Sequence, residues 1–296
     1  MKKIIITIIL INLDLYSQSA GNIGLSFLKF GFGARNLALA DLGSVISDDL
    51  TALHYNPSRL KSERNEVFVA HNSWIQDINS QLFGIKTDIY GFPIAFGFNI
   101  TNVDDIEIRT RPGEPEAKFN ANYFYGSLSS AYRFSNDISI GATIRYIYEG
   151  ILNYEASGVG FDFGLTYTTP VENLTLSSVV RNIGSMNSLR NKSTELPSEF
   201  RLSSQYKFTI LDLDTDLMIA AEYQKYFKSN YHLNFGIEFI YNKLFSIRSG
   251  YQTNYESRDL TAGFGLIWGN LKLDYAFIPF KLSLGNVNVF SISFLF

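Results

Sequence analysis

The sequence has no cysteine, only three histidines, and no apolar run long enough to form a transmembrane helix. Without cysteine the chain has neither disulfides nor thiolate metal ligands. His54, His71 and His232 are far apart, and none has a carboxylate at ligand or catalytic spacing. The motifs G-x-S-x-G and H-E-x-x-H and the phosphate-binding loop are also missing from the sequence. We therefore expect no metal, no cofactor and no enzyme activity.

A strong charge of either sign is missing as well. The chain has 25 Lys and Arg residues against 28 Asp and Glu residues, which gives a formal net charge of −3. Nucleic-acid-binding domains carry a pronounced positive charge, because contacts to phosphates supply much of their affinity. The mild acidity therefore argues against a nucleic-acid partner.

Residues 1–17 are predicted to be a secretory signal peptide. Lys2 and Lys3 precede a mostly apolar run over residues 4–13, and small and polar residues follow it. This run is too short to cross a bilayer. We therefore expect the chain to be exported, with cleavage near Ser17 or Ala20.

The sequence is rich in aromatic residues, which make up 15% of it, beside 18% charged residues. Apolar and polar side chains alternate, most clearly over residues 138–148, as in a strand with two different faces. We identify about 14 such segments after residue 64. Long connections, the longest at 103–120 and 184–196, mostly alternate with short ones, as in bacterial membrane barrels. The exception is the first hairpin, whose connection at 75–77 is short although it is expected to face outward.

The last alternating segment, residues 286–296, runs to the end of the chain. Phe290, Ile292, Phe294 and Phe296 fall on one face, and mostly small or polar residues fall on the other. An apolar edge strand would template aggregation, whereas a closed barrel has no edge. We therefore predict an all-β antiparallel outer-membrane barrel of about 14 strands, with Phe296 as its assembly signal. The edge strand of a soluble sandwich is the alternative.

Residues 18–62 lack this alternation and are predicted to form short helices near 34–42 and 50–55. The second helix should end at Asn56-Pro57, because the residue before a proline avoids the helical region. A barrel of about 14 strands has a lumen that needs either water or a plug. The predicted organisation is a signal peptide at 1–17, an N-terminal hatch inside the lumen at 18–62, and a transmembrane β-barrel at 63–296.

The hatch segment also carries a recognisable motif. It consists of Gly33, Ala34, Arg35, Asp48, Asp49, Asn56 and Pro57. In this motif, and in further stretches over nearly all of the mature chain, the sequence resembles the PorV/PorQ family, a branch of the FadL-like outer-membrane proteins. It departs from the family pattern at Ala40-Asp41 and at Ser58-Arg59.

The resemblance implies a hatch-bearing barrel of 14 strands in the outer membrane, with both termini in the periplasm. For the best-known members it also implies a role in the type IX secretion system of Bacteroidota. There the barrel receives substrates by their C-terminal signal domain and passes them on for surface attachment or release. The expected partners are outer-membrane lipid, secreted proteins with that signal domain or other type IX components, and the barrel assembly machinery during biogenesis.

Several charged residues have both a functional and a structural interpretation. Asp48 and Asp49 are candidates for a substrate or cation contact, with helix capping and a salt bridge as the alternative. Arg35 is expected to pair with a carboxylate of the lumen. A charged external connection is predicted to face either a partner or only solvent, with Arg109, Arg111 and Glu114.

Two functions from different classes remain. The favoured hypothesis is binding or handover of type IX cargo at the cell surface, with a sealed lumen. The alternative is a FadL-like transporter, in which a hydrophobic molecule enters a pocket near the hatch and leaves sideways through a gap in the wall. That route needs an apolar pocket, for which the candidates are Phe27, Leu28, Phe30 and Phe32.

Overall fold

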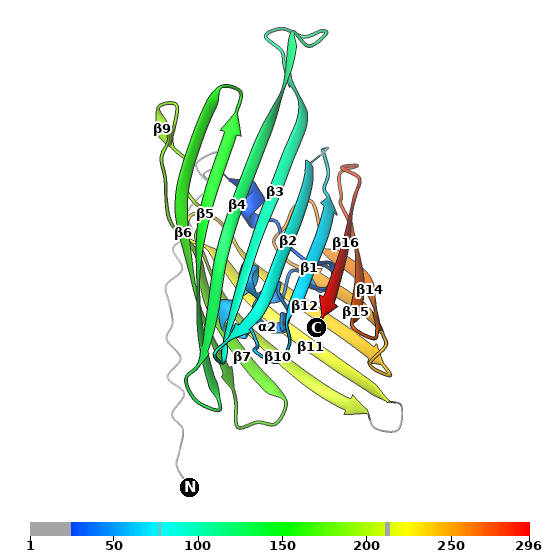
Figure 1. Ribbon diagram of the computed structural model, residues 1–296. Coiled ribbons are helices and arrows are strands. Elements are labelled where there is room, and N and C mark those ends of the chain that lie inside the picture. The colour runs from blue at the N-terminus through cyan, green and yellow to red at the C-terminus, as the bar shows by residue number, and fades with distance from the viewer. Residues whose placement is uncertain (1–24, 77, 211–213) are drawn as a thin grey trace.

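The chain forms a closed antiparallel β-barrel around an N-terminal segment of short helices (Figure 1). The structure is a computed structural model and describes residues 25–76, 78–210 and 214–296. Within these residues 14 strands close the barrel, which confirms the predicted fold class. In chain order they are β1 (Glu66–Ser73), β2 (Ile78–Ile89), β3 (Phe92–Ile108), β4 (Ala117–Arg133), β5 (Ile138–Ile151), β6 (Tyr154–Thr168), β7 (Leu174–Met186), β10 (Glu199–Ile210), β11 (Thr215–Tyr226), β12 (Tyr231–Tyr241), β13 (Phe245–Gln252), β14 (Leu260–Trp268), β15 (Leu271–Pro279) and β16 (Asn286–Leu295).

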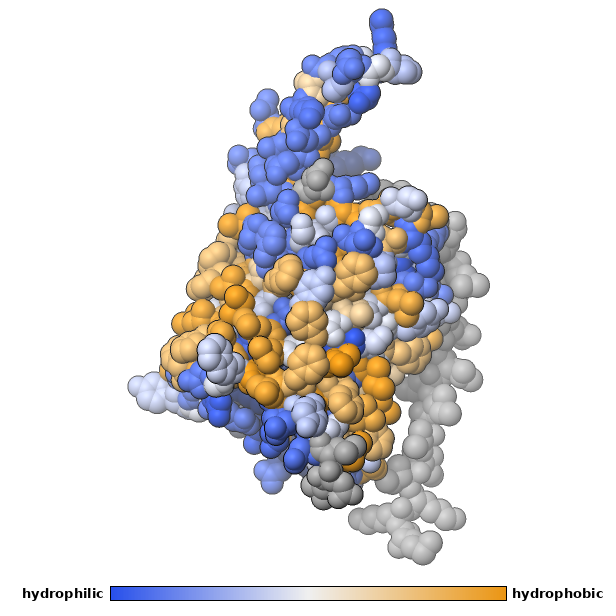
Figure 2. Space-filling view, turned by 90° about the vertical axis from the view of Figure 1, so that its right-hand side faces the viewer, coloured by the Kyte–Doolittle hydropathy of each residue, from blue (hydrophilic) through white to orange (hydrophobic). Residues whose placement is uncertain are grey.

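The distribution of side chains is the inverse of that in a soluble protein. In β5, Ile144 and Tyr146 are 47% and 50% exposed on the outside, whereas Thr143 and Arg145 are buried in the lumen. Figure 2 shows hydrophobic side chains gathered around the middle of the visible face, with hydrophilic ones above them. An apolar outer face and a polar inner face are expected of a barrel that is surrounded by lipid.

The first and last strands close the barrel. β16 pairs with both β15 and β1, and Val69 lies opposite Ile292 in the register between β1 and β16. Beyond the strands, the backbone N–H groups of Asn65 and Phe296 each donate to the other residue's carbonyl oxygen at 3.1 Å. The prediction that residues 286–296 form the closing strand is therefore confirmed, and the sheet has no free edge where β1 and β16 meet.

Residues 25–60, called the hatch from here on, lie inside the barrel and are almost entirely buried. The helix predicted at 34–42 ends early, because Ala40 and Asp41 have φ angles of 57° and 64°, which a right-handed helix cannot contain. A further short helix, not predicted, follows this turn. The hatch elements are η1 (Ser26–Lys29), α1 (Ala34–Ala38), α2 (Gly43–Ile46), α3 (Ala52–Tyr55) and η2 (Pro57–Arg59).

The strands β3 and β4 extend farther than the sequence pattern predicts. Instead of a loop at 103–120, the structure has a turn at 109–116 on top of a two-stranded ribbon. Val103 pairs with Ala121, but the next pair is Ile106 with Phe119, because a β-bulge adds one residue to β3. The bulge shifts the alternation, so this part of β3 did not look like a strand. Likewise, the predicted connection at 184–196 contains a small hairpin of β8 (Ser188–Leu189) and β9 (Lys192–Ser193).

The two ends of the barrel differ. The short turns at 90–91 and 242–244 lie at the end where β1 begins and β16 stops, and the ribbon of β3 and β4 projects from the opposite end (Figure 1). No helix in the described part of the chain is long and apolar enough to cross a membrane. The predicted signal peptide lies outside the described residues.

Candidate functional site

The hatch touches the barrel wall where glycines face each other on neighbouring strands. An added Cβ atom would collide with Leu50 at the first glycine of the first pair, with Pro57 and Ser58 at that of the second, and with Leu42 at that of the third. The wall thus has no side chains at these places, and the hatch packs directly against strand backbone. The three pairs are Gly84–Gly97, Gly141–Gly164 and Gly236–Gly250.

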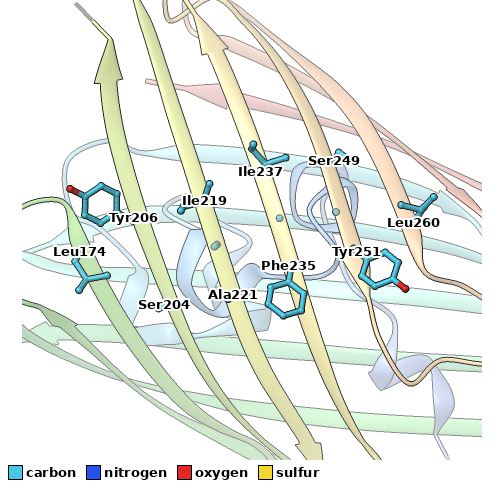
Figure 3. A pocket seen from close by; sticks show the side chains of 13 residues that line it. Leu174, Ser204, Tyr206, Ile219, Ala221, Phe235, Ile237, Ser249, Tyr251 and Leu260 are labelled. Carbon is cyan, nitrogen blue, oxygen red and sulfur yellow. The ribbon is translucent and has the colours of Figure 1, made fainter.

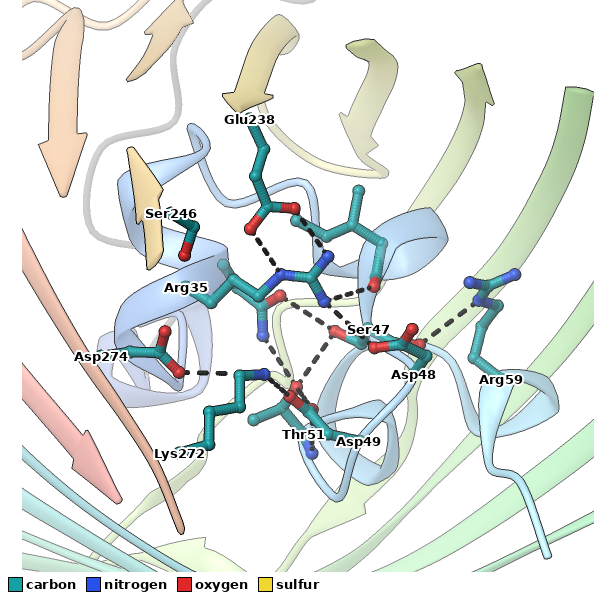
Figure 4. Close-up of polar contacts among 12 residues, drawn as sticks. Arg35, Ser47, Asp48, Asp49, Thr51, Arg59, Glu238, Ser246, Lys272 and Asp274 are labelled. Atoms are coloured by element: carbon teal, nitrogen blue, oxygen red, sulfur yellow. Dashed lines mark hydrogen bonds and ion pairs between the residues drawn. The ribbon is translucent and has the colours of Figure 1, made fainter. Parts of the chain in front are cut away.

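A network of ion pairs around Arg35 joins the hatch to the wall (Figure 4). Nε and Nη2 of Arg35 donate to the two carboxylate oxygens of Glu238 at 3.1 and 2.8 Å. Nη1 donates to Oδ1 of Asp48 at 3.0 Å. The neighbouring Asp49 pairs with Nζ of Lys272 on β15 at 3.1 Å. Bidentate pairing of guanidinium with carboxylate is among the strongest hydrogen-bond geometries, so this network fixes the orientation of the hatch.

The cations of this network keep both acidic residues of the hatch ionised. Burial raises the pKa of Asp48, but the charges of Arg35 and Lys272 outweigh it and hold the pKa well below its usual range. Burial likewise raises the pKa of Asp49, and Lys272 brings it below its usual value. Both carboxylates already have cationic partners, and no group of metal-ligating side chains forms among the described residues. The geometry therefore gives these acids a role in holding the hatch.

A second buried cluster surrounds His54 of the hatch, beside three fully buried arginines of the wall. Nη2 of Arg181 is 3.1 Å from Nε2 of His54, and Arg181 has no acceptor. The ring proton must therefore lie on Nδ1, which donates to the hydroxyl of Tyr125 at 3.0 Å. Burial, and then the charges of Arg181, Arg145 and Arg201, lower the pKa of His54 well below its usual value. The imidazole is thus neutral at physiological pH.

Each of the three wall arginines has a carboxylate partner within 3.2 Å. A buried cation with a matched anion contributes orientation rather than a free binding site. The cluster therefore holds the hatch and does not present unpaired positive charge to a ligand. The closest pairs are Arg145–Asp162 at 2.8 Å, Arg181–Glu199 at 2.7 Å and Arg201–Glu222 at 3.1 Å.

Towards the ribbon end, apolar side chains occupy the lumen above the charged groups. Phe27 of η1 is buried and its ring stacks on Tyr123 of β4 with centroids 4.9 Å apart. Phe32 meets the ring of His54 edge-on at 4.7 Å. This apolar cluster continues to Met186 and Leu196 in the wall. It provides the environment that an uncharged hydrophobic ligand requires.

The wall beside the apolar cluster has a seam between β7 and β10. The pairing of these strands stops at Arg181 and Glu199, although β7 continues beyond this point. The connection from β9 to β10 fills the space, and two hydrogen bonds join it to Asn182 of β7. Nδ2 of Asn182 donates to the carbonyl of Pro197 at 3.2 Å, and Oγ of Ser198 donates to the carbonyl of Asn182 at 2.7 Å. The seam is thus closed by a connection and not by a strand ladder.

A pocket of about 290 Å³ opens at this seam. Ser185 of β7 and Glu195 of the connection lie on its rim and are exposed. Met186 and Leu196 line the pocket and also belong to the apolar cluster of the lumen. These two side chains therefore separate the lumenal cluster from the outside of the barrel.

A larger apolar pocket, of about 460 Å³, lies on the outer surface over β7 and β10 to β14 (Figure 3). Phe235, Ile237 and Tyr251 surround it and point away from the lumen. Ala221 and Ser249 leave the depression between them because their side chains are small. All residues that line this pocket belong to the barrel wall, and it forms part of the outer apolar surface.

The remaining residues of the predicted motif lie at the contacts between hatch and wall. Gly33, with φ of 79°, precedes α1, and the N–H of Ala34 donates to Oγ of Ser291 at 3.1 Å. Asn56 caps η2 by accepting from the N–H of Ser58 at 3.1 Å, and with Pro57 it packs against the second glycine pair. The motif thus describes how the hatch sits in the barrel.

The residues predicted in the external connection are on the tip of the ribbon, far from the hatch. Arg109 pairs with Glu107 at 2.6 Å on the exposed surface, and Arg111 and Glu114 are exposed as well. Phe296 is exposed at the other end of the barrel, beside Phe294. The structure brings none of these residues together with the hatch motif.

The glycine pairs were not predicted from the sequence. For Arg35 a carboxylate of the lumen was expected, and for the two acidic residues a salt bridge was one of the interpretations, but neither Glu238 nor Lys272 was chosen as the partner. A usable signal for the pairs was present, since each glycine falls on the inward register of its strand, where polar residues are otherwise expected. The partners Glu238 and Lys272 had no such signal, because each is one of many charged residues on inward positions.

The barrel is similar in fold to solved structures of channels and transporters. Superposition on the CymD monoaromatic hydrocarbon channel gives a TM-score of 0.62 and 12% identity, covering 90% of this chain and 97% of that one. The toluene transporter TodX of Pseudomonas putida gives 0.63 and 11%, covering 90% and 96%. A FadL homologue of Pseudomonas aeruginosa gives 0.53 and 12%, covering 89% and 97%.

The fold is that of these channels. Neither a family model nor a curated protein matches the sequence. The FadL-like part of the resemblance agrees with these structures in overall fold, and the PorV/PorQ part gains no support from them.

Proposed function

We propose that the protein is an outer-membrane channel for uncharged hydrophobic small molecules, which was the alternative hypothesis from the sequence. The observation that carries this proposal is the apolar cluster that extends from the hatch to the seam between β7 and β10. The fold shared with the CymD hydrocarbon channel and TodX supports it. In the proposed placement the apolar outer face contacts lipid, the short turns and both termini face the periplasm, and Phe296 serves the assembly machinery.

The energetics of the two possible exits favour the seam. A path straight through the hatch breaks buried ion pairs such as Arg35–Glu238, and removing one partner of such a pair costs about 3–5 kcal/mol. A sideways path displaces the connection, which contacts Asn182 through neutral hydrogen bonds, Glu149 through the hydroxyl of Thr194, and Lys228 through the exposed ion pair of Glu195. Neutral hydrogen bonds contribute only about 0.5–1.5 kcal/mol each, a hydrogen bond to a charged group about 1.5–3 kcal/mol, and an exposed ion pair about 0.2–1 kcal/mol. We therefore assign the exit to the seam, past Met186 and Leu196.

A reversible cross-link across the seam tests this route. Because the chain has no cysteine, Ser185→Cys and Glu195→Cys introduce the only two thiols, on the rim of the same pocket. A short bis-methanethiosulfonate linker should abolish uptake of a radiolabelled alkylbenzene, and dithiothreitol should restore it. The matched controls are the two single-cysteine variants treated with the same reagent, which should retain uptake. Unchanged uptake in the cross-linked protein would exclude the seam as the exit.

The type IX hypothesis stays a prediction that derives from the resemblance. The exposed charged tip of the ribbon, with Arg109, Arg111 and Glu114, is the surface that such a role would use. Deleting the gene tests it directly. Loss of proteins with a type IX signal domain from the cell surface, with unchanged hydrocarbon uptake, would favour cargo handover over the channel.

A further inference from the structure

The two strands β3 and β4 rise above the rest of the barrel as a free ribbon, residues 104–120 (Figure 1). β2 pairs with β3 only as far as Val103, and β5 pairs with β4 only as far as Ala121. Beyond these residues the ribbon has no neighbouring strand. A two-stranded ribbon is marginally stable alone in water, so the chemistry of its faces indicates what each of them contacts.

The two faces of the ribbon are chemically different. Cross-strand partners share a face, and alternate pairs lie on opposite faces. One face carries the apolar pairs Ile106–Phe119 and Ile108–Ala117. The other face carries Glu107 opposite Lys118, whose Nζ is also 3.0 Å from Asp105.

The apolar face is the one that continues into the lumen. Alternate residues of β4 point in the same direction, so Phe119 shares its side of the strand with Ala121, Tyr123 and Tyr125. Ala121 and Tyr125 are buried inside the barrel. The ring of Tyr123 stacks on Phe27 of the hatch. A continuous apolar strip therefore runs from the ribbon to the apolar cluster above the hatch.

The β-bulge at Asp104 and Asp105 keeps this strip continuous on β3. Below the bulge odd-numbered residues such as Thr101 face the lumen, and above it Ile106 does so. If the same sequence formed a regular strand without a bulge, Asp105 and Glu107 would lie on the lumenal face instead. Asp105 adopts a φ of 56°, and its N–H donates to Oδ1 of Asn120 at 3.2 Å. Bulges commonly re-aim side chains in this way.

We propose that the lumenal face of the ribbon, formed by Ile106, Ile108, Ala117, Phe119 and Ala121, is a capture surface for uncharged apolar small molecules. The inference rests on the proposed channel function and adds to it the place where a ligand first binds. The strip ends at the apolar cluster, which argues for a ligand that continues into the lumen. Membrane lipid is a poor occupant, because Glu107, Lys118 and the tip place charged groups beside the strip.

Two neighbouring tryptophan probes test the difference between the faces. In a Trp74→Phe, Trp268→Phe background, Phe119→Trp reports on the capture surface and Lys118→Trp on the opposite face at the same height. The full chain is placed in lipid nanodiscs and titrated with bromobenzene, which quenches tryptophan fluorescence on contact. We expect quenching of the Phe119→Trp protein at a several-fold lower concentration. Equal quenching of the two probes would overturn the proposal.

The apolar strip supplies a second test, in uptake. Phe119→Glu places a carboxylate in the strip, whereas Lys118→Glu places one on the opposite face at the same height. At low toluene concentration we expect several-fold slower uptake for Phe119→Glu and unchanged uptake for Lys118→Glu, with folding of both checked by heat-modifiable gel mobility. Equal uptake by the two folded variants would contradict the proposal. If the wild-type protein takes up no toluene, the channel function fails, and the fluorescence test still decides whether the surface binds apolar molecules.

Discussion

Replacing Arg35 by methionine is expected to release the hatch while leaving the barrel folded. The guanidinium group makes a bidentate pair with Glu238 and further hydrogen bonds to Asp48 and to the carbonyl of Ile46. All of these contacts join α1 to the wall or to the rest of the hatch. Methionine has a similar length but donates no hydrogen bond, so the substitution removes these contacts without leaving a large void.

The expected magnitude follows from what remains after the substitution. Oε2 of Glu238 loses its donor, whereas Oε1 keeps Nε of Arg248 at 2.6 Å. An unpaired buried polar group costs about 1–3 kcal/mol, and a broken buried ion pair about 3–5 kcal/mol. Because Arg248 stays in place and the side chain of Asp48 is 31% exposed, we expect the lower end of the second range, about 3 kcal/mol. This corresponds to a roughly hundredfold larger opening equilibrium of the hatch.

Hydrogen exchange measures this opening separately from barrel unfolding. Amides of the hatch should exchange roughly a hundredfold faster in Arg35→Met, while amides of β3 to β6 keep their protection. Arg109→Met is the matched control, because it breaks an exposed pair with Glu107, and such pairs contribute little. Unchanged hatch exchange in Arg35→Met, or equal effects of both variants, would refute the assignment of Arg35 as the residue that anchors the hatch.

Three further perturbations have defined outcomes. Gly141→Val should displace Pro57 and increase protease cleavage of the hatch, whereas Gly126→Val, where a Cβ has its nearest neighbour at 3.6 Å, should not. The pKa of His54 in the seated hatch is lowered from its ordinary value of 6.5, so the released hatch binds a proton that the seated hatch does not. As the pH decreases below about 6.5, the hydrogen-exchange protection of the hatch should therefore decrease, and His54→Gln should remove this pH dependence. Leu196→Ala should open the barrier at the seam and raise the rate of toluene uptake, and a slower rate would contradict its place on the route.

The strands were predictable because lipid on one side and a polar lumen on the other impose a period of two. In β16, Phe290 and Phe294 face outward and Ser291 and Ser293 face inward, as the alternation indicates. The pattern fails at the bulge of β3. Below the bulge even-numbered residues face outward, but the extra residue makes the even-numbered Ile106 face the lumenal side. A local shift of this kind leaves no mark in composition, so the predicted loop was too long.

The seating of the hatch was predictable only in part. Arg35 and the two acidic residues were singled out, but their partners lie on strands far along the chain. Alternation predicts only that a charged residue faces inward, and it does not indicate which inward charge pairs with which residue of the hatch. Arg35 and Glu238 are separated by 203 residues, and only barrel closure and register bring them together. The helix predicted near 50–55 is present as α3 and ends before Asn56, as the proline indicates. The helix predicted at 34–42 was too long and α2 was missed, because contacts with the wall, rather than a periodic pattern of their own, determine where these helices begin and end.

The central claim, that the barrel admits uncharged hydrophobic molecules, is tested most directly by uptake of radiolabelled toluene. Cells of an outer-membrane host without hydrocarbon channels of its own would be compared with and without this protein at equal barrel abundance. Expression of the wild-type chain should raise the initial uptake rate several-fold, and the cross-link between Ser185→Cys and Glu195→Cys should return it to the level of the empty host. Equal uptake with and without the wild-type protein would contradict the account.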